Sequence, residues 1–174
     1  MNTLTKPDPR LNVPKRLVKL NNLANRISVQ ILGTRDNCIL VSTMLNQLLT
    51  DLGYNSRLVR ITAAMFPDNR NQHGTVLGSE GDGTRCQKAE KGMWHGHLGV
   101  MVDEKWLLDP TLDQIDGLKP VVIRLSQNGG TYYRVNKSTV RHTIYPKQVG
   151  FKWAGDARPC RWKDIYNSIL EELK

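Results

Sequence analysis

The stretch "HLGVMVDEKWLLDPT", residues 97–111, decides the fold because it predicts two paired strands. Its apolar runs, 97–102 and 105–109, are separated by polar residues, which is typical of an antiparallel hairpin. Pro110 favours an extended conformation for Asp109, which suits the end of a strand. With a turn centred on Asp103, position 97 pairs with 109, so the two side chains share one face. A two-residue turn at 103–104 would instead place them on opposite faces.

Two helices are predicted ahead of this hairpin. Apolar residues recur at helical spacing over about 14–30. A second helix, about 37–52, has Asp36 or Asn37 as its N-cap and Gly53 as its C-cap. Its apolar stripe is wide, so we expect this helix at the centre of the core. The stripe comprises Leu40, Val41, Met44, Leu45, Leu48, Leu49 and Leu52.

The remaining elements predict an α+β domain. Strands are expected at 56–66, 120–125, 131–135 and 139–145, and a last helix contains Trp162, Ile165, Ile169 and Leu173. Residues 67–92 are rich in glycine and poor in core-forming residues, so they are expected to form a long surface loop. Helices followed by a meander of antiparallel strands indicate a single α+β domain over 14–174, after a flexible N-terminal arm over 1–13.

Composition narrows the class of protein. The 174 residues suit one domain, and three scattered cysteines are too few for a disulfide framework. No apolar run is long enough to cross a membrane, and the N-terminus lacks the apolar core of a signal peptide, so we expect a cytoplasmic protein with no membrane contact.

The net charge of +9 suits nucleic acid or an acidic partner. Without a dense basic run or an aromatic ladder, nucleic acid is not favoured as the main ligand, and nothing indicates an oligomeric state.

Three residues form the candidate catalytic set. Cys38 lies in the first turn of the second helix, where free backbone N–H groups and the helix dipole favour the reactive thiolate and can stabilise an oxyanion. His97 is the candidate base, and Asp109 is placed to orient its ring. Taken singly, each has a simpler interpretation: a small buried hydrophobe, a hydrogen-bonded polar residue and a turn cap.

A rival set of residues would bind a metal. His95 and His97 lie two positions apart, so they share a strand face, and Asp109, His73 or Cys86 would add ligands. No Cys-x-x-Cys or His-x-x-x-His spacing supports this alternative. We therefore expect no metal site and prefer His97 to His95 as the base.

Other residues are assigned less specific roles. Cys160 is interpreted as structural, and His142 lies in a predicted strand with no identifiable partner. The second oxyanion donor stays open among Gln30, Asn37 and Trp94.

The order of cysteine, histidine and aspartate resembles the transglutaminase-like superfamily of papain-like cysteine enzymes, which is related to the arylamine N-acetyltransferases. In that pattern a cysteine opens a helix, Gly-x-x-x-Arg-x-Val leads into a strand, and His-x-x-Val-x-Val precedes Asp-Pro-Thr. The corresponding segments here are Cys38, "GYNSRLV" at 53–59, "HLGVMV" at 97–102 and "WLLDPT" at 106–111. The match spans about residues 30–115, and Gly99 stands where transglutaminases often have an aromatic residue.

The resemblance implies a papain-like core in which a central helix packs on an antiparallel sheet. It also implies a triad of Cys38, His97 and Asp109 that acts through a thioester, with no metal or organic cofactor. The acyl group of a peptide, protein or small amide would pass to water or to an amine, and acyl-CoA is the alternative donor. A different class of function is an inactive module whose basic surface binds nucleic acid or an acidic protein.

Overall fold

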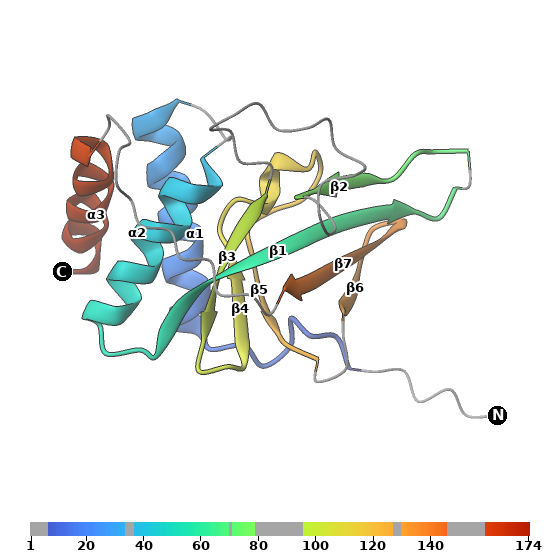
Figure 1. Ribbon diagram of the computed structural model, residues 1–174, viewed down its shortest axis with the longest axis horizontal. Coiled ribbons are helices and arrows are strands. Elements are labelled where there is room, and N and C mark those ends of the chain that lie inside the picture. The colour runs from blue at the N-terminus through green and yellow to red at the C-terminus, as the bar shows by residue number, and fades with distance from the viewer. Residues whose placement is uncertain (1–6, 34–36, 70, 79–95, 127–129, 146–158) are drawn as a thin grey trace.

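The computed structural model describes residues 7–33, 37–69, 71–78, 96–126, 130–145 and 159–174 (Figure 1). They form helices packed beside one antiparallel sheet, which confirms the α+β class. The helices are α1 (Lys15–Leu32), α2 (Cys38–Asp51) and α3 (Pro159–Leu173), with a short 3-10 helix at Leu112–Gln114. The strands are β1 (Ser56–Pro67), β2 (Thr75–Leu77), β3 (His97–Val102), β4 (Trp106–Asp109), β5 (Val121–Arg124), β6 (Thr131–Val135) and β7 (Ser138–Tyr145).

The long strand β1 organises the sheet, whose strand order is β5-β4-β3-β1-β7-β6. One edge of β1 pairs with β7, and the first half of β1 pairs with β3 as far as Ile61↔His97. The short strand β2 also pairs with β1, beginning just beyond that point at Ala63↔Leu77. His97 therefore lies where β2 and β3 approach one another.

The expectation of an uninterrupted loop over 67–92 is wrong at β2. This strand has only three residues, which is too short for its own sequence to signal, and it forms by pairing with the long β1. Residues 79–92 of the expected loop lie outside the described residues.

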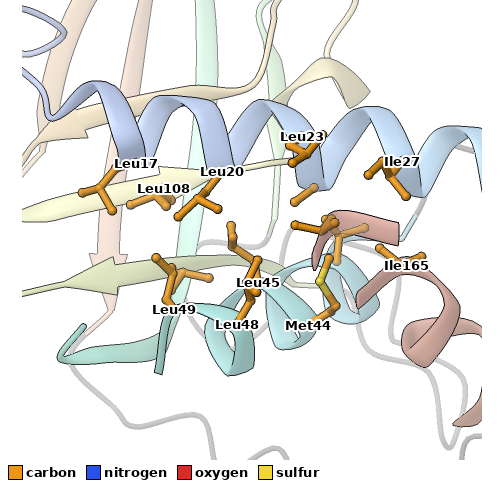
Figure 2. Packing of buried hydrophobic residues seen from close by; sticks show 14 of the residues in the cluster. Leu17, Leu20, Leu23, Ile27, Met44, Leu45, Leu48, Leu49, Leu108 and Ile165 are labelled. Carbon is orange, nitrogen blue, oxygen red and sulfur yellow. The ribbon is translucent and has the colours of Figure 1, made fainter. Parts of the chain in front are cut away.

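Helices α1 and α2 lie against one face of the sheet, and α3 packs on α1 and α2 on the side away from the sheet (Figure 1). Figure 2 shows leucines of α1 and α2 facing one another, with Leu108 of β4 and Ile165 of α3 joining the same cluster. Burial of this surface, at about 25 cal/mol per Å² of apolar area, fixes α2 against the sheet. The apolar stripe of α2 thus lies in the main core, as its sequence predicted.

The opposite face of the sheet carries a second apolar cluster. It includes Ile61 of β1, Leu107 of β4 and Val140 of β7, all with no more than 1% of their surface exposed. Because side chains alternate along a strand, His97 and Asp109 project to this same face. Two polar side chains therefore lie in a largely apolar setting.

The hairpin register differs from the predicted one by two residues. Val100 pairs with Leu108, so Asp109 falls opposite Gly99 and diagonal to His97. The cause is a turn displaced by one residue, in which Asp103 and Glu104 both adopt left-handed conformations with φ of 53° and 50°. A shift of two keeps side chains on the same face, so the predicted proximity survives the error.

The described part of the N-terminal segment, residues 7–13, contacts both edge strands of the sheet, β5 and β6. The carbonyl oxygen of Pro9 accepts a hydrogen bond of 2.8 Å from the backbone N–H of Arg124, at the end of β5. The Arg10 guanidinium lies 4.9 Å from the ring centre of Tyr133. Residues 1–6 of the predicted arm lie outside the described residues. Among the described helices, none is both long and apolar enough to pass through a bilayer.

Candidate active site

Helix α2 begins at Cys38, beside the start of β3. One turn further along the helix, the Ser42 hydroxyl donates a buried hydrogen bond of 2.9 Å to the Leu98 carbonyl oxygen. The Cys38 Sγ lies 3.9 Å from the Gly96 carbonyl oxygen. These two contacts attach the first turns of α2 to the start of β3 and bring the half-buried, free thiol of Cys38 to His97.

His97 and Asp109 form a fully buried pair. The His97 Nε2 lies 2.9 Å from both Asp109 Oδ1 and Asp109 Oδ2, and both side chains are 0% exposed. The backbone N–H of Thr111 donates to Oδ1 at 3.3 Å. Since an ionised carboxylate can only accept, Nε2 is the nitrogen that carries a proton toward Asp109. Nδ1 of His97 is then the nitrogen that remains for the Cys38 thiol; it is buried and forms no hydrogen bond with the described residues.

The electrostatics of the pair favour an imidazolium. Burial opposes a charge on His97, but the negative charge and hydrogen bond of Asp109, together with Cys38, raise the pKa of His97 to about 10. Burial also opposes a charge on Asp109, but the charge of His97 and hydrogen bonds from two histidines hold the pKa of this carboxyl well below its usual range. A cation therefore lies beside the thiol, and a thiolate is the form that such a cation stabilises.

The second histidine bound to Asp109 is His142 of β7. Its Nε2 lies 3.1 Å from Asp109 Oδ2, and its ring stacks on Tyr133 with centroids 5.8 Å apart. No partner for this residue could be identified from the sequence, because its place depends on the long-range pairing Ala63↔His142. One signal was present: His142 alternates with Val140 and Ile144, and a polar residue on an apolar face requires a buried partner.

Gly78 lies against the other side of His97. Its φ is +87°, and a Cβ atom built there would lie 2.7 Å from the Ile61 carbonyl oxygen and 3.0 Å from the His97 Cβ. Only a residue without a side chain fits at this distance. The end of β2 thus buttresses the start of β3, although no pattern in the sequence assigned Gly78 a role.

The other candidates are not brought into this cluster by the described residues. His95, Cys86 and Trp94 lie outside them, and the exposed His73 lies before β2. Asn37 directly precedes Cys38 at the N-cap of α2, whereas Gln30 is exposed on α1. Within the described segments, no three His, Cys, Asp or Glu side chains are grouped to hold a metal ion.

The arrangement is suited to nucleophilic chemistry at sulfur. It brings together a thiol at a helix start, an imidazole and a carboxylate in the order that activated nucleophiles require. Comparison with models of protein families, with curated proteins and with solved structures found no match to this chain. Function is therefore inferred from the geometry of the site.

Proposed function

We propose that this chain is a cysteine-dependent acyl-transfer enzyme of the transglutaminase-like, papain-like type. The observation that carries the proposal is the buried pair in which both oxygens of Asp109 lie 2.9 Å from His97 Nε2, at the start of the helix that begins with Cys38. The chain order and spacing of these three residues resemble that superfamily, and the α+β architecture is compatible with it.

A purely structural role explains this cluster poorly. Burying charged groups costs several kcal/mol per ion, and apolar residues of similar volume would stabilise a core at least as well. The surrounding face is already apolar, yet it holds an aspartate and two histidines with no more than 1% of their surface exposed. Perturbed, buried titratable groups of this kind are concentrated at catalytic sites.

The proposed reaction has two halves. In the first, the Cys38 thiolate attacks the carbonyl carbon of an amide, and a C–S bond forms. The imidazolium of His97 then gives its proton to the leaving amine as the C–N bond breaks, which leaves a thioester on Cys38. In the second, His97 takes a proton from water or from an amine as that group attacks the thioester, and the C–S bond breaks to regenerate the thiolate.

Two further groups support these steps. Asp109 holds the imidazole in orientation and stabilises its positive charge in both halves. The backbone N–H of Cys38 is among the first N–H groups of α2, which have no acceptor within the helix, so it is placed to stabilise the oxyanion. The same machinery accepts an amide or a thioester donor, so an acyl-CoA donor is a variant of this proposal.

The first test is the alkylation rate of each cysteine against pH, followed by peptide mass spectrometry. In the wild type, Cys38 should react at about pH 6 at a rate near its rate at about pH 9, because the imidazolium stabilises the thiolate. His97→Ala should lower the rate at about pH 6 by at least about tenfold and leave the rate at about pH 9 much less changed. His73→Ala is the matched control, since His73 is an exposed histidine away from the cluster.

Either outcome is informative. If His97→Ala leaves the Cys38 profile unchanged, the thiol–imidazole pair does not exist, and the basic chain is better tested as a binding module by salt-dependent retention on DNA. If the pair is active, a glutamine-containing peptide offered with and without a primary amine separates the two acceptors. Ammonia release alone indicates hydrolysis, whereas incorporation of the amine indicates transfer.

A further inference from the structure

His142 shares the carboxylate of the proposed triad, but the reaction above does not use it. Its Nε2 lies 3.1 Å from Asp109 Oδ2, while His97 Nε2 lies 2.9 Å from both oxygens. An ionised carboxylate accepts hydrogen bonds only, so both imidazoles must donate through Nε2. One aspartate therefore binds two histidines, and the two have different surroundings.

The neighbour of the second ring nitrogen distinguishes the two histidines. Both Nδ1 atoms are buried, and neither forms a hydrogen bond with the described part of the chain. Cys38 lies beside His97 and favours its imidazolium, whereas the described residues place no such group at Nδ1 of His142. A proton on that nitrogen would be a buried donor without an acceptor, which costs about 1–3 kcal/mol. The bare Nδ1 of a neutral ring avoids that cost.

The described groups packed around His142 provide no second anion to balance a second cation. The Tyr133 ring stacks on it, and burial, followed by the charge of Asp109, raises the pKa of the Tyr133 phenol, so this neighbour stays uncharged. On Tyr133 in turn lies the Arg10 guanidinium, which is paired with Asp8. The Asp109 carboxylate is the anion in contact with His142, and His97 already shares it.

We infer that His142 is a positioning residue that, as a neutral Nε2–H donor, holds the Asp109 carboxylate with both oxygens toward His97. With the Thr111 backbone N–H on Oδ1 and His142 on Oδ2, the carboxylate is fixed from both sides. The positive charge of the site then belongs to His97. The role in catalysis rests on the proposed function, whereas the tautomer rests on geometry alone.

Two variants separate the hydrogen bond from the packing. His142→Phe keeps a ring to stack on Tyr133 but has no donor. His142→Gln keeps a side-chain N–H that reaches toward Asp109. His73→Ala again controls for the loss of a histidine. Two measurements are made on each: ring nitrogen NMR of the histidines at about pH 7, and the pH profile of Cys38 alkylation with peptide mass spectrometry.

The expected results follow from the loss of one donor to a buried anion. In the wild type, NMR should show His142 as the neutral Nε2–H tautomer. In His142→Phe, Asp109 should take up a proton more easily, so the acid limit of Cys38 reactivity should move upward by about one pH unit. His142→Gln should restore most of that shift, and His73→Ala should match the wild type. If His142 only filled space, His142→Gln would not restore the wild-type pH profile of Cys38 alkylation.

Several results would overturn the inference. The wild-type NMR spectrum alone tests the tautomer, even if His142→Phe does not fold. A charged His142, or one protonated at Nδ1, would refute it. A wild-type profile in His142→Phe, combined with loss of low-pH reactivity in His97→Ala, would refute the positioning role and leave the proposed function standing. If Cys38 is unreactive even in the wild type, the proposed function fails. In that case the positioning role is tested by NMR, without Cys38 reactivity: unchanged His97 ring signals in His142→Phe would refute it.

Discussion

At the scale of single residues, Gly99 shows how closely the face around the site is packed. A Cβ atom at this position would lie 2.9 Å from the Leu107 Cδ1 and 3.0 Å from both the Ile61 Cδ1 and the Leu108 carbonyl oxygen. The structure therefore explains why this position is occupied by glycine. There is no space here for a side chain on the face that holds His97 and Asp109.

Gly99→Ala should lower the free energy of unfolding by about 1–3 kcal/mol, because overpacking forces neighbouring atoms to move. Urea unfolding measures this loss. Ile61→Val removes the Cδ1 atom in contact, so the double variant Gly99→Ala with Ile61→Val should lose less than the sum of the two single variants. Additive losses would show that the Ile61 contact does not limit this position.

The residues of the candidate site differ in how far sequence could find them. Cys38, His97 and Asp109 follow from local signals: a helix start and a hairpin bounded by a histidine and an aspartate. His142 does not, because its contact with Asp109 depends on β7 pairing with β1, a strand about eighty positions earlier. Gly78 was not predicted for the same reason, since its significance lies in its distance from His97.

At the scale of elements, local patterns predicted the helices and most of the strands, whereas turn geometry decided the register. The turn after β3 uses Asp103 and Glu104 in a conformation that glycine or asparagine usually adopts. Glu104 is also paired with Arg57 of β1 at 2.6 Å. The sequence contains no glycine to mark this turn, and the predicted register was therefore displaced, although by an even number of residues.

The junction of β2 and β3 gives the prediction at this scale. Gly78 and Gly53 have similar positive φ angles, +87° and +84°, but only at Gly78 would an added Cβ atom have neighbours within 4 Å, among them the His97 Cβ. Substitution by alanine should destabilise the protein in both cases, by about 1–2 kcal/mol from the left-handed backbone. Only Gly78→Ala should also displace His97 and reduce Cys38 alkylation at about pH 6.

Gly53→Ala is the matched control, because it carries the same backbone strain at a site with open space around it. Both variants are compared by urea unfolding and by the pH profile of Cys38. Equal profiles in the two variants would show that the end of β2 does not support the position of His97.

At the scale of the whole molecule, the main apolar core and the candidate site lie on opposite faces of the sheet. The larger apolar cluster lies between the helices and one face, and it fixes α2. The titratable cluster lies on the other face, where β3, β4 and β7 converge. Cys38 links the two, because the start of α2 extends to the start of β3. Because His97 and Asp109 are fully buried beside this core, the free energy of folding should depend on their charge state.

The pH dependence of stability follows from the pKa values. Folding raises the pKa of His97 from 6.5 to about 10, so its contribution is complete below about pH 6.5 and is lost as the pH rises toward 10. Folding lowers the pKa of Asp109 from 3.8, so its contribution is complete above about pH 4 and is lost only in stronger acid. The buried pair should therefore stabilise the protein most between about pH 4 and 6.5.

Urea unfolding at about pH 5.5, 7.5 and 9.5 tests this expectation, since the free energy of unfolding should fall across the series. Asp109→Asn removes the anion that raises the pKa of His97, so this variant should be less stable at about pH 5.5 and should show a flatter alkaline decline. Asp116→Asn removes an exposed carboxylate and should keep the wild-type slope. If the free energy of unfolding falls equally with rising pH in Asp109→Asn and Asp116→Asn, the alkaline loss comes from other groups. His97 and Asp109 then do not form the ion pair on which the site depends.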